Sequence, residues 1–299
     1  MMPANAPLDI APLDIAHLQS WIGRTETATE VATADLVRRF HATFDVEPGA
    51  PQPGDVAPPL LHWCLTQPAA PTGQLGADGH PMRGGFLPPV PLPRRMWAGG
   101  DLRFDGEMAV GDTVQRLSRV DDVTVKTGRT GTLCFVTVAH EITSGSRLVV
   151  RERQDIVYRG LDPAPETATT PETASAPKPA PVAAPAGAHQ RVVDPSPPLL
   201  FRYSALTFNG HRIHYDRSYV TQVEGYPGLI VHGPLQATLL LRFASEIHGA
   251  APARFSFRAL SPLFDTAPVQ LHADADGASL KLWTARPDGP LAMTAEAQW

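Results

Sequence analysis

The sequence predicts an α+β protein in which one unit, a helix wrapped by an antiparallel sheet, occurs twice. The same order of signals appears on both sides of residues 161–188, a segment dominated by Pro, Ala and Thr. Toward the end of each half, apolar and polar residues alternate as they do in strands with one buried face. The second half also contains a helical stretch that is apolar on nearly every side. A curved antiparallel sheet is the simplest cover for such a helix.

The first half opens with a helix, predicted from about Ala34 to Phe44 with Thr33 as its N-cap. Its apolar residues share one face: Leu36, Val37, Phe40 and Phe44. Strands come after this helix. Residues 133–138 alternate in polarity, and residues 136–153 have the pattern of two strands joined by a turn at 143–145.

The second half repeats this order with a stronger helix. Pro234 suits the first helical turn, and residues 235–247 supply the apolar body. Alternation at residues 279–283 indicates a strand, and residues 282–298 have the pattern of two strands around a turn at 287–289.

The segment between the halves is predicted to be a linker. Residues 161–188 contain no aromatic residue, so they cannot bury enough apolar surface to offset the entropy lost on ordering. We therefore expect a first domain at residues 1–160, a linker at 161–197 and a second domain at 198–299.

Composition narrows the function classes. The net charge is -5 and the basic residues are scattered, which argues against nucleic-acid or membrane-surface partners. The N-terminus lacks the features of a signal peptide, and the longest apolar run, near residues 235–241, is too short to span a bilayer. Cys64 and Cys134 lie far apart in apolar surroundings, as reduced core thiols do. A cytoplasmic location is expected.

Polar, titratable residues gather just before the apolar helix. The sequence at 208–216 is Phe-Asn-Gly-His-Arg-Ile-His-Tyr-Asp, and His232-Gly233 directly precedes Pro234. This arrangement can build a pocket against a helix N-terminus, where the backbone favours negative charge. A metal site is a weaker interpretation, because the segment reads as a loop and none of the closed Cys/His zinc spacings is present. We predict no metal.

Asn209, His214 and the His232-Gly233 pair match a motif of the MaoC-like hydratases and dehydratases, which have a double hot-dog fold. The chain resembles this family over its whole length apart from the linker. The form of residues 208–216 is similar to the mitochondrial 3-hydroxyacyl-thioester dehydratases. Together with Trp-Ile-Gly-Arg-Thr-Glu at 21–26, it is more similar still to the bacterial 3-methylfumaryl-CoA hydratases, also called mesaconyl-C4-CoA hydratases.

The resemblance implies addition of water to an α,β-unsaturated CoA thioester, with no cofactor beyond the CoA of the substrate. His214 is then the base, and the backbone N–H of Gly233 donates to the oxyanion. The family has an acidic residue where this chain has Asn209, and a neutral amide can only hold the water or the substrate. His232 is expected at the helix start in a structural role, and Tyr226 among the substrate contacts.

A substrate with a free carboxylate would require a buried arginine. Candidates in the Gly- and Pro-rich loop of the first half are Arg83, Arg94 and Arg95, and Arg202 precedes the motif; Arg94 is preferred. In the first half, Asp45 occupies the position that matches Asn209, but no histidine comes after it at the matching spacing. The sequence therefore predicts one active site, with the first half lining the substrate tunnel.

The leading hypothesis is reversible hydration of 3-methylfumaryl-CoA to citramalyl-CoA. One alternative is an (R)-3-hydroxyacyl-thioester dehydratase of fatty-acid metabolism. Another is a non-catalytic acyl-CoA-binding hot-dog protein, in which His214 would only cap a turn or pair with Asp216. A homodimer of these internal pseudodimers is a further expectation.

Overall fold

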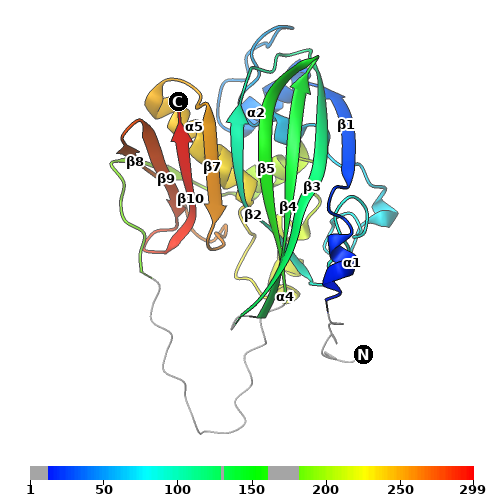
Figure 1. Ribbon diagram of the computed structural model, residues 1–299. Helices are drawn as coiled ribbons and strands as arrows, with labels where there is room; N and C mark the ends of the chain where they lie inside the picture. The colour runs from blue at the N-terminus through cyan, green and yellow to red at the C-terminus, as the bar shows by residue number, and fades with distance from the viewer. Residues whose placement is uncertain (1–12, 129–130, 161–181) are drawn as a thin grey trace.

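The computed structural model describes residues 13–128, 131–160 and 182–299, and ten antiparallel strands form one sheet within them (Figure 1). The first half contributes β1 (Thr25–Val31), β2 (Arg94–Phe104), β3 (Thr113–Gly128), β4 (Gly131–Ser144) and β5 (Arg147–Arg159). The second half contributes β6 (His189–Val193), β7 (Arg254–Ala259), β8 (Val269–Asp276), β9 (Ser279–Ala285) and β10 (Leu291–Gln298). Across the sheet the order is β1-β3-β4-β5-β2-β7-β10-β9-β8-β6.

The two five-stranded halves join where β2 pairs with β7. Gly99 lies opposite Arg258 and Gly100 opposite Phe257 in this register. A Cβ atom at Gly99 would lie 2.7 Å from the carbonyl oxygen of Phe257, so the strands can approach this closely only with glycine there. One hydrophobic core runs beneath the junction and includes buried residues of both halves.

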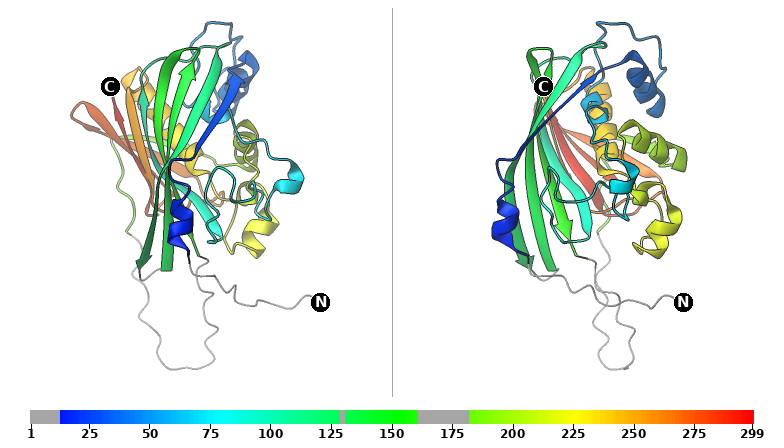
Figure 2. Two further views of the ribbon diagram at one scale, coloured as in Figure 1. Left: turned by 45° about the vertical axis from the view of Figure 1, so that its right-hand side comes forward. Right: turned by 90° about the vertical axis from the view of Figure 1, so that its right-hand side faces the viewer.

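Four helices cover one face of the sheet (Figure 2). They are α2 (Ala34–Thr43), α3 (Pro197–Leu206), α4 (Arg217–Gln222) and α5 (Gly233–His248). The short α1 (Ile15–Gln19) contacts β3. Short 3-10 helices are η1 (Leu61–Cys64), η2 (Thr72–Gln74) and η3 (Arg212–His214).

The two predicted helices are confirmed. Thr33 caps α2, since its Oγ1 accepts a hydrogen bond from the N–H of Leu36 at 3.1 Å. Pro234 lies in the first turn of α5, and this helix ends at Gly249, which adopts the left-handed conformation with φ of 85°. Eight residues of α5 are buried, and the helix contacts β2, β7, β8, β9 and β10.

The expectation of a central helix in each half holds only for the second half. The sequence Pro-Pro-Leu-Leu-His-Trp at 58–63 echoes Pro-Gly-Leu-Ile-Val-His at 227–232, so the repeat matches His62 with His232 at the start of α5. At this position the first half has the single 3-10 turn η1, and α2 contacts α3 instead. Pro58 and Pro59 precede this turn, and Pro68 and Pro71 come after it. A proline inside a helix removes a hydrogen bond and clashes with the preceding turn, so no long helix can form here.

Part of the predicted linker is ordered structure. Residues 189–193, inside the expected 161–197, form β6 and pair with β8, while residues 161–181 lie outside the described residues. The division into domains at 1–160 and 198–299 stays a prediction. Cys64 and Cys134 are buried and free, as predicted, and burial raises their pKa values to about 12 and about 11. Within the described ranges, no helix is long and apolar enough to cross a membrane.

Candidate active site

The motif that comes after α3 is held by its own hydrogen bonds. The side-chain oxygen of Asn209 accepts from the backbone N–H of His211 at 3.0 Å. Asp216 then caps α4 by accepting from the N–H of Tyr219 at 3.0 Å, and it also forms an ion pair with Arg212 at 2.8 Å. These contacts set the short turn η3, which ends on His214.

His214 is buried, and its ring has one defined proton position. Nδ1 lies 2.8 Å from the backbone carbonyl oxygen of Ile230. A carbonyl oxygen can only accept, so Nδ1 carries the hydrogen and Nε2 keeps a lone pair. Burial lowers the pKa of His214 to about 3, so the ring is neutral at pH 7. A neutral imidazole with an unprotonated Nε2 is the form that a general base requires.

His232 packs directly against His214 at the start of α5. The two rings are stacked, with centroids 3.6 Å apart and planes inclined by 18°. Nε2 of His232 lies 2.8 Å from the hydroxyl oxygen of Ser204, and burial lowers the pKa of His232 well below its ordinary value. Gly233 is the first residue of α5, where backbone N–H groups have no acceptor within the helix. N–H groups that could serve as donors for an oxyanion therefore lie next to the His214–His232 stack.

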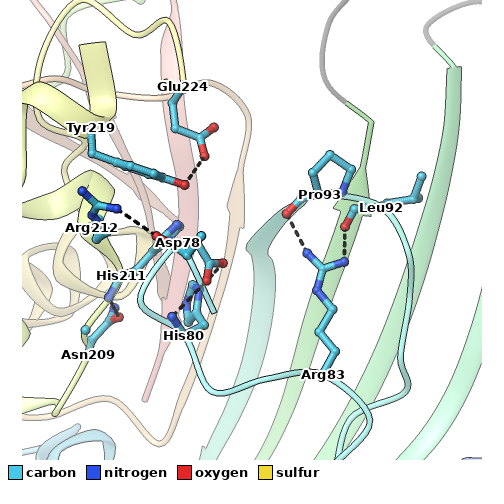
Figure 3. Close-up of polar contacts among 12 residues, drawn as sticks. Asp78, His80, Arg83, Leu92, Pro93, Asn209, His211, Arg212, Tyr219 and Glu224 are labelled. Atoms are coloured by element: carbon cyan, nitrogen blue, oxygen red, sulfur yellow. Dashed lines mark hydrogen bonds and ion pairs between the residues drawn. The ribbon is translucent and has the colours of Figure 1, made fainter. Parts of the chain in front are cut away.

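A loop of the first half docks onto this motif (Figure 3). Gly79 has φ of +89°, and a Cβ atom there would overlap the carbonyl oxygen of Gly210. Arg212 donates from its backbone to the carbonyl oxygen of Asp78 at 2.9 Å and from its guanidinium to that of Ala77 at 3.0 Å. This docking brings an Asp and a His of the first half to the site.

Asp78 and His80 form a hydrogen-bonded pair beside His211 of the motif (Figure 3). Nδ1 of His80 lies 3.1 Å from a carboxylate oxygen of Asp78, and the backbone N–H of His80 donates to the other at 3.0 Å. The ring of His80 lies 4.1 Å from that of His211, which in turn lies 5.4 Å from that of His214. The sequence prediction missed Asp78 and His80. The sequence Asp-Gly-His at 78–80, in a loop that was expected to approach the tunnel, could have indicated them.

Burial lowers the pKa values of His80 and His211, and the positive charge of Arg95 lowers them further. Burial alone would raise the pKa of Asp78, but hydrogen bonds from His80 and the charge of Arg95 bring it below its ordinary value. Asp78, His80 and His211 place their ligand atoms within 4.8 Å of one another, as metal ligands can. The positive charge of Arg95 lowers the pKa values of all three groups and so weakens their attraction for a cation.

The other predicted arginines have protein partners. Arg94 donates to the backbone oxygen of Glu224 at 3.0 Å, lies 3.4 Å from its carboxylate, and sits over the ring of Tyr226 at 4.9 Å. Arg83 donates to the carbonyl oxygens of Leu92 and Pro93 in the Pro-rich loop (Figure 3). It also donates to the carbonyl oxygen of Val90. Arg202 donates to the carbonyl oxygen of Ala42 at 3.3 Å. Arg83 and Arg202 thus hold the backbone in place.

A hollow of about 590 Å³ lies between α2 and α3 rather than around the histidines. Its lining includes Phe201, Arg202 and Phe208, and Phe208 immediately precedes Asn209. None of the described histidines lines this hollow. We therefore place the candidate active site at the histidines and not in the hollow.

Comparison with known proteins shows the family of this chain. The model of the hydroxyacyl-thioester dehydratase type 2 family matches residues 60–265. Among solved structures, a MaoC-like dehydratase from Phytophthora capsici superposes with a TM-score of 0.65 at 16% identity, covering 96% of this chain and 99% of that one. A Mycobacterium tuberculosis protein described as a double hot-dog fold superposes with a TM-score of 0.54 at 16% identity, covering 93% and 96%.

The chain therefore belongs to the hydroxyacyl-thioester dehydratase type 2 family, a group of hydro-lyases, and the predicted double hot-dog fold is confirmed. The particular relatives agree with this class. Mesaconyl-C(4)-CoA hydratase of Chloroflexus aurantiacus is 44% identical over 284 residues, which cover 95% of this chain and 98% of that protein. The mitochondrial hydroxyacyl-thioester dehydratase type 2 of Schizosaccharomyces pombe is 39% identical over 101 residues, 33% of each chain.

Proposed function

We propose that this protein catalyses the reversible hydration of 3-methylfumaryl-CoA to citramalyl-CoA. The substrate assignment draws on the 44% identity to a mesaconyl-C(4)-CoA hydratase along nearly the whole chain. The observation that carries the chemistry is His214, whose Nδ1 is fixed on the oxygen of Ile230 beside the N-terminus of α5. CoA enters as part of the substrate, and no cofactor is required.

In this mechanism Nε2 of His214 removes a proton from water as the water oxygen attacks the β-carbon. Such a positioned base contributes about 10²–10⁴-fold in rate. The electron pair moves onto the thioester oxygen, which accepts from the N–H of Gly233 with the dipole of α5 behind it. His214 then returns the proton to the α-carbon, which restores the neutral ring.

Asn209 orients the water in this proposal. Its side-chain oxygen already accepts from the N–H of His211, so the NH₂ group remains to donate to the water oxygen. His232 fixes the plane of His214 by stacking on it. Tyr226, whose ring lies 5.8 Å from that of Phe264, forms part of the acyl wall together with Arg94. A cytoplasmic location and a homodimer of pseudodimers remain part of the proposal.

The test is a direct assay of the purified protein with 3-methylfumaryl-CoA, crotonyl-CoA and longer enoyl-CoAs. We expect the highest kcat/KM with the branched diacid thioester. Turnover of the unbranched thioesters alone would instead support the second candidate, an (R)-3-hydroxyacyl-thioester dehydratase of fatty-acid metabolism. The family match and the Schizosaccharomyces pombe relative favour that candidate. Membership of a hydro-lyase family disfavours the non-catalytic alternative.

A further inference from the structure

The substrate of the proposed function, on which this inference rests, carries a carboxylate on the very carbon that receives the water. The reaction therefore requires an anion to be held within a few ångströms of the water that His214 activates. Taking an unpaired carboxylate out of water is costly, so a cationic group must meet it there. A guanidinium is well suited, because it can donate two parallel hydrogen bonds to a carboxylate.

Arg94, the candidate preferred from the sequence, is already engaged. Its guanidinium contacts both the backbone oxygen and the carboxylate of Glu224, and it stacks on Tyr226. Glu224 also accepts from the hydroxyl of Tyr219 at 3.1 Å, so the whole group is fixed from several sides (Figure 3). A substrate carboxylate would have to compete with Glu224 for this arginine.

Arg95 is the next residue on β2 and lies directly opposite Tyr158 of β5, a residue only 1% exposed. Arg95 itself is half-buried. Arg83, from the loop that carries Asp78 and His80, places its guanidinium 5.7 Å from the centre of the Tyr158 ring, so Arg95 borders that loop. The positive charge of Arg95 lowers the pKa values of Asp78, His80 and His211. Within the described part of the chain, no carboxylate forms an ion pair with Arg95, and Asp78 is turned toward His80.

We propose that Arg95 binds the free carboxylate of the substrate and selects acyl-CoA thioesters that carry a carboxylate on the β-carbon. The first half then recognises the acid group, while the second half supplies the base and the oxyanion donor. The rings of His80, His211 and His214 are in contact one after the other, from the docked loop of the first half to the proposed base of the second half.

The test compares kcat/KM for 3-methylfumaryl-CoA and crotonyl-CoA in Arg95→Met. We expect kcat/KM for 3-methylfumaryl-CoA to fall by about 10²-fold or more, because the carboxylate of the substrate is left buried and unpaired. The kcat/KM for crotonyl-CoA should change by less than about threefold. Arg95→Lys keeps the positive charge but cannot donate two parallel hydrogen bonds, so it should recover only part of the lost kcat/KM. Arg103→Met, at an exposed arginine of the same strand, is the matched control and should leave both substrates unchanged.

Equal losses for both substrates in Arg95→Met would show a structural role and overturn the proposal. A selective loss in Arg94→Met instead would assign the carboxylate to Arg94. If the wild-type protein does not hydrate the diacid, the proposed function fails separately, and binding of the saturated succinyl-CoA and butyryl-CoA still decides the role of Arg95. A preference for succinyl-CoA that Arg95→Met abolishes supports the proposal, and equal binding overturns it.

Discussion

The two halves carry a histidine at matching positions of the repeat, His62 and His232, but surround it differently. Nε2 of His62 lies 3.0 Å from the carboxylate of Glu152, which also accepts from the indole of Trp63. Burial alone would raise the pKa of Glu152, but the hydrogen bonds from His62 and Trp63 bring it below its ordinary value. His232 instead stacks on a second neutral imidazole and meets the hydroxyl of Ser204.

The residues after each histidine differ as well. His62 leads into Trp63 in a single 3-10 turn, whereas His232 leads into Gly233 and the 16-residue helix α5. Only the second arrangement provides free N–H donors, a helix dipole and a neutral base in one place. The first-half copy is therefore an anchor built on a buried pair, and in the proposed function the second-half copy carries the chemistry.

The largest effect is expected when the base is removed. His214→Gln should lower kcat by about 10²–10⁴-fold, since the positioned base is lost. His62→Gln should lower the melting temperature by breaking the pair with Glu152, while the folded protein keeps its kcat. Steady-state kinetics and thermal unfolding of both variants check this. Comparable kcat losses in the two variants would mean that the halves share the chemistry.

As pH falls from neutral, stability should respond first through the buried histidines of the candidate active site. The pKa values of His80, His211, His214 and His232 are all lowered by burial. The unfolded chain binds protons near pH 6.5 that the folded protein excludes, so the free energy of unfolding falls as pH drops below that value, by up to about 1.4 kcal/mol per pH unit for each such histidine.

Glu152 affects the free energy of unfolding at lower pH, because its pKa is lowered in the folded protein. Its contribution is complete above the unfolded carboxyl pKa of about 4.3 and is lost as pH falls through the folded value. Unfolding between pH 8 and 4 should show a shallower slope near pH 6 in His211→Asn, and no such change in Glu152→Gln. An unaltered slope in His211→Asn would contradict the assignment.

Gly79→Ala tests the contact between the halves. A Cβ atom there would overlap the backbone of Gly210, and φ is +89°. Gly84→Ala is the matched control, since φ is +88° but the nearest atom lies at 3.6 Å. Both variants carry backbone strain of about 1–3 kcal/mol. Only Gly79→Ala should also lose hydratase activity, and equal losses would mean that the docked loop is not needed for the site.

The smallest effect is expected from chelators. Because the charge of Arg95 disfavours a cation at Asp78, His80 and His211, dialysis against a strong chelator should leave kcat unchanged. Metal analysis of the purified protein provides the second measurement. A loss of activity that Zn²⁺ restores would make these three residues ligands and would give the first half a direct part in the chemistry.

The helices α2 and α5 were predictable because their signals are local. The apolar body of α5 and the cap of α2 are visible in short stretches of sequence, and both helices form where expected. The expected first-half counterpart of α5 was wrong, because prolines around η1 prevent the helix that the repeat implied. β6 was missed because five residues beside a Pro- and Ala-rich stretch carry little periodic signal.

The duplicated α+β plan and the motif of Asn209, His214 and His232-Gly233 were predictable from short stretches of sequence, because they depend on local patterns and spacings. Asp78 and His80 lie beside that motif only in the folded chain. The contact that brings them there runs between backbone atoms of Gly79 and Gly210, and it joins segments about 130 residues apart. Backbone contacts between glycines leave no hydrophobic periodicity in the sequence, so only the folded chain reveals which charges meet.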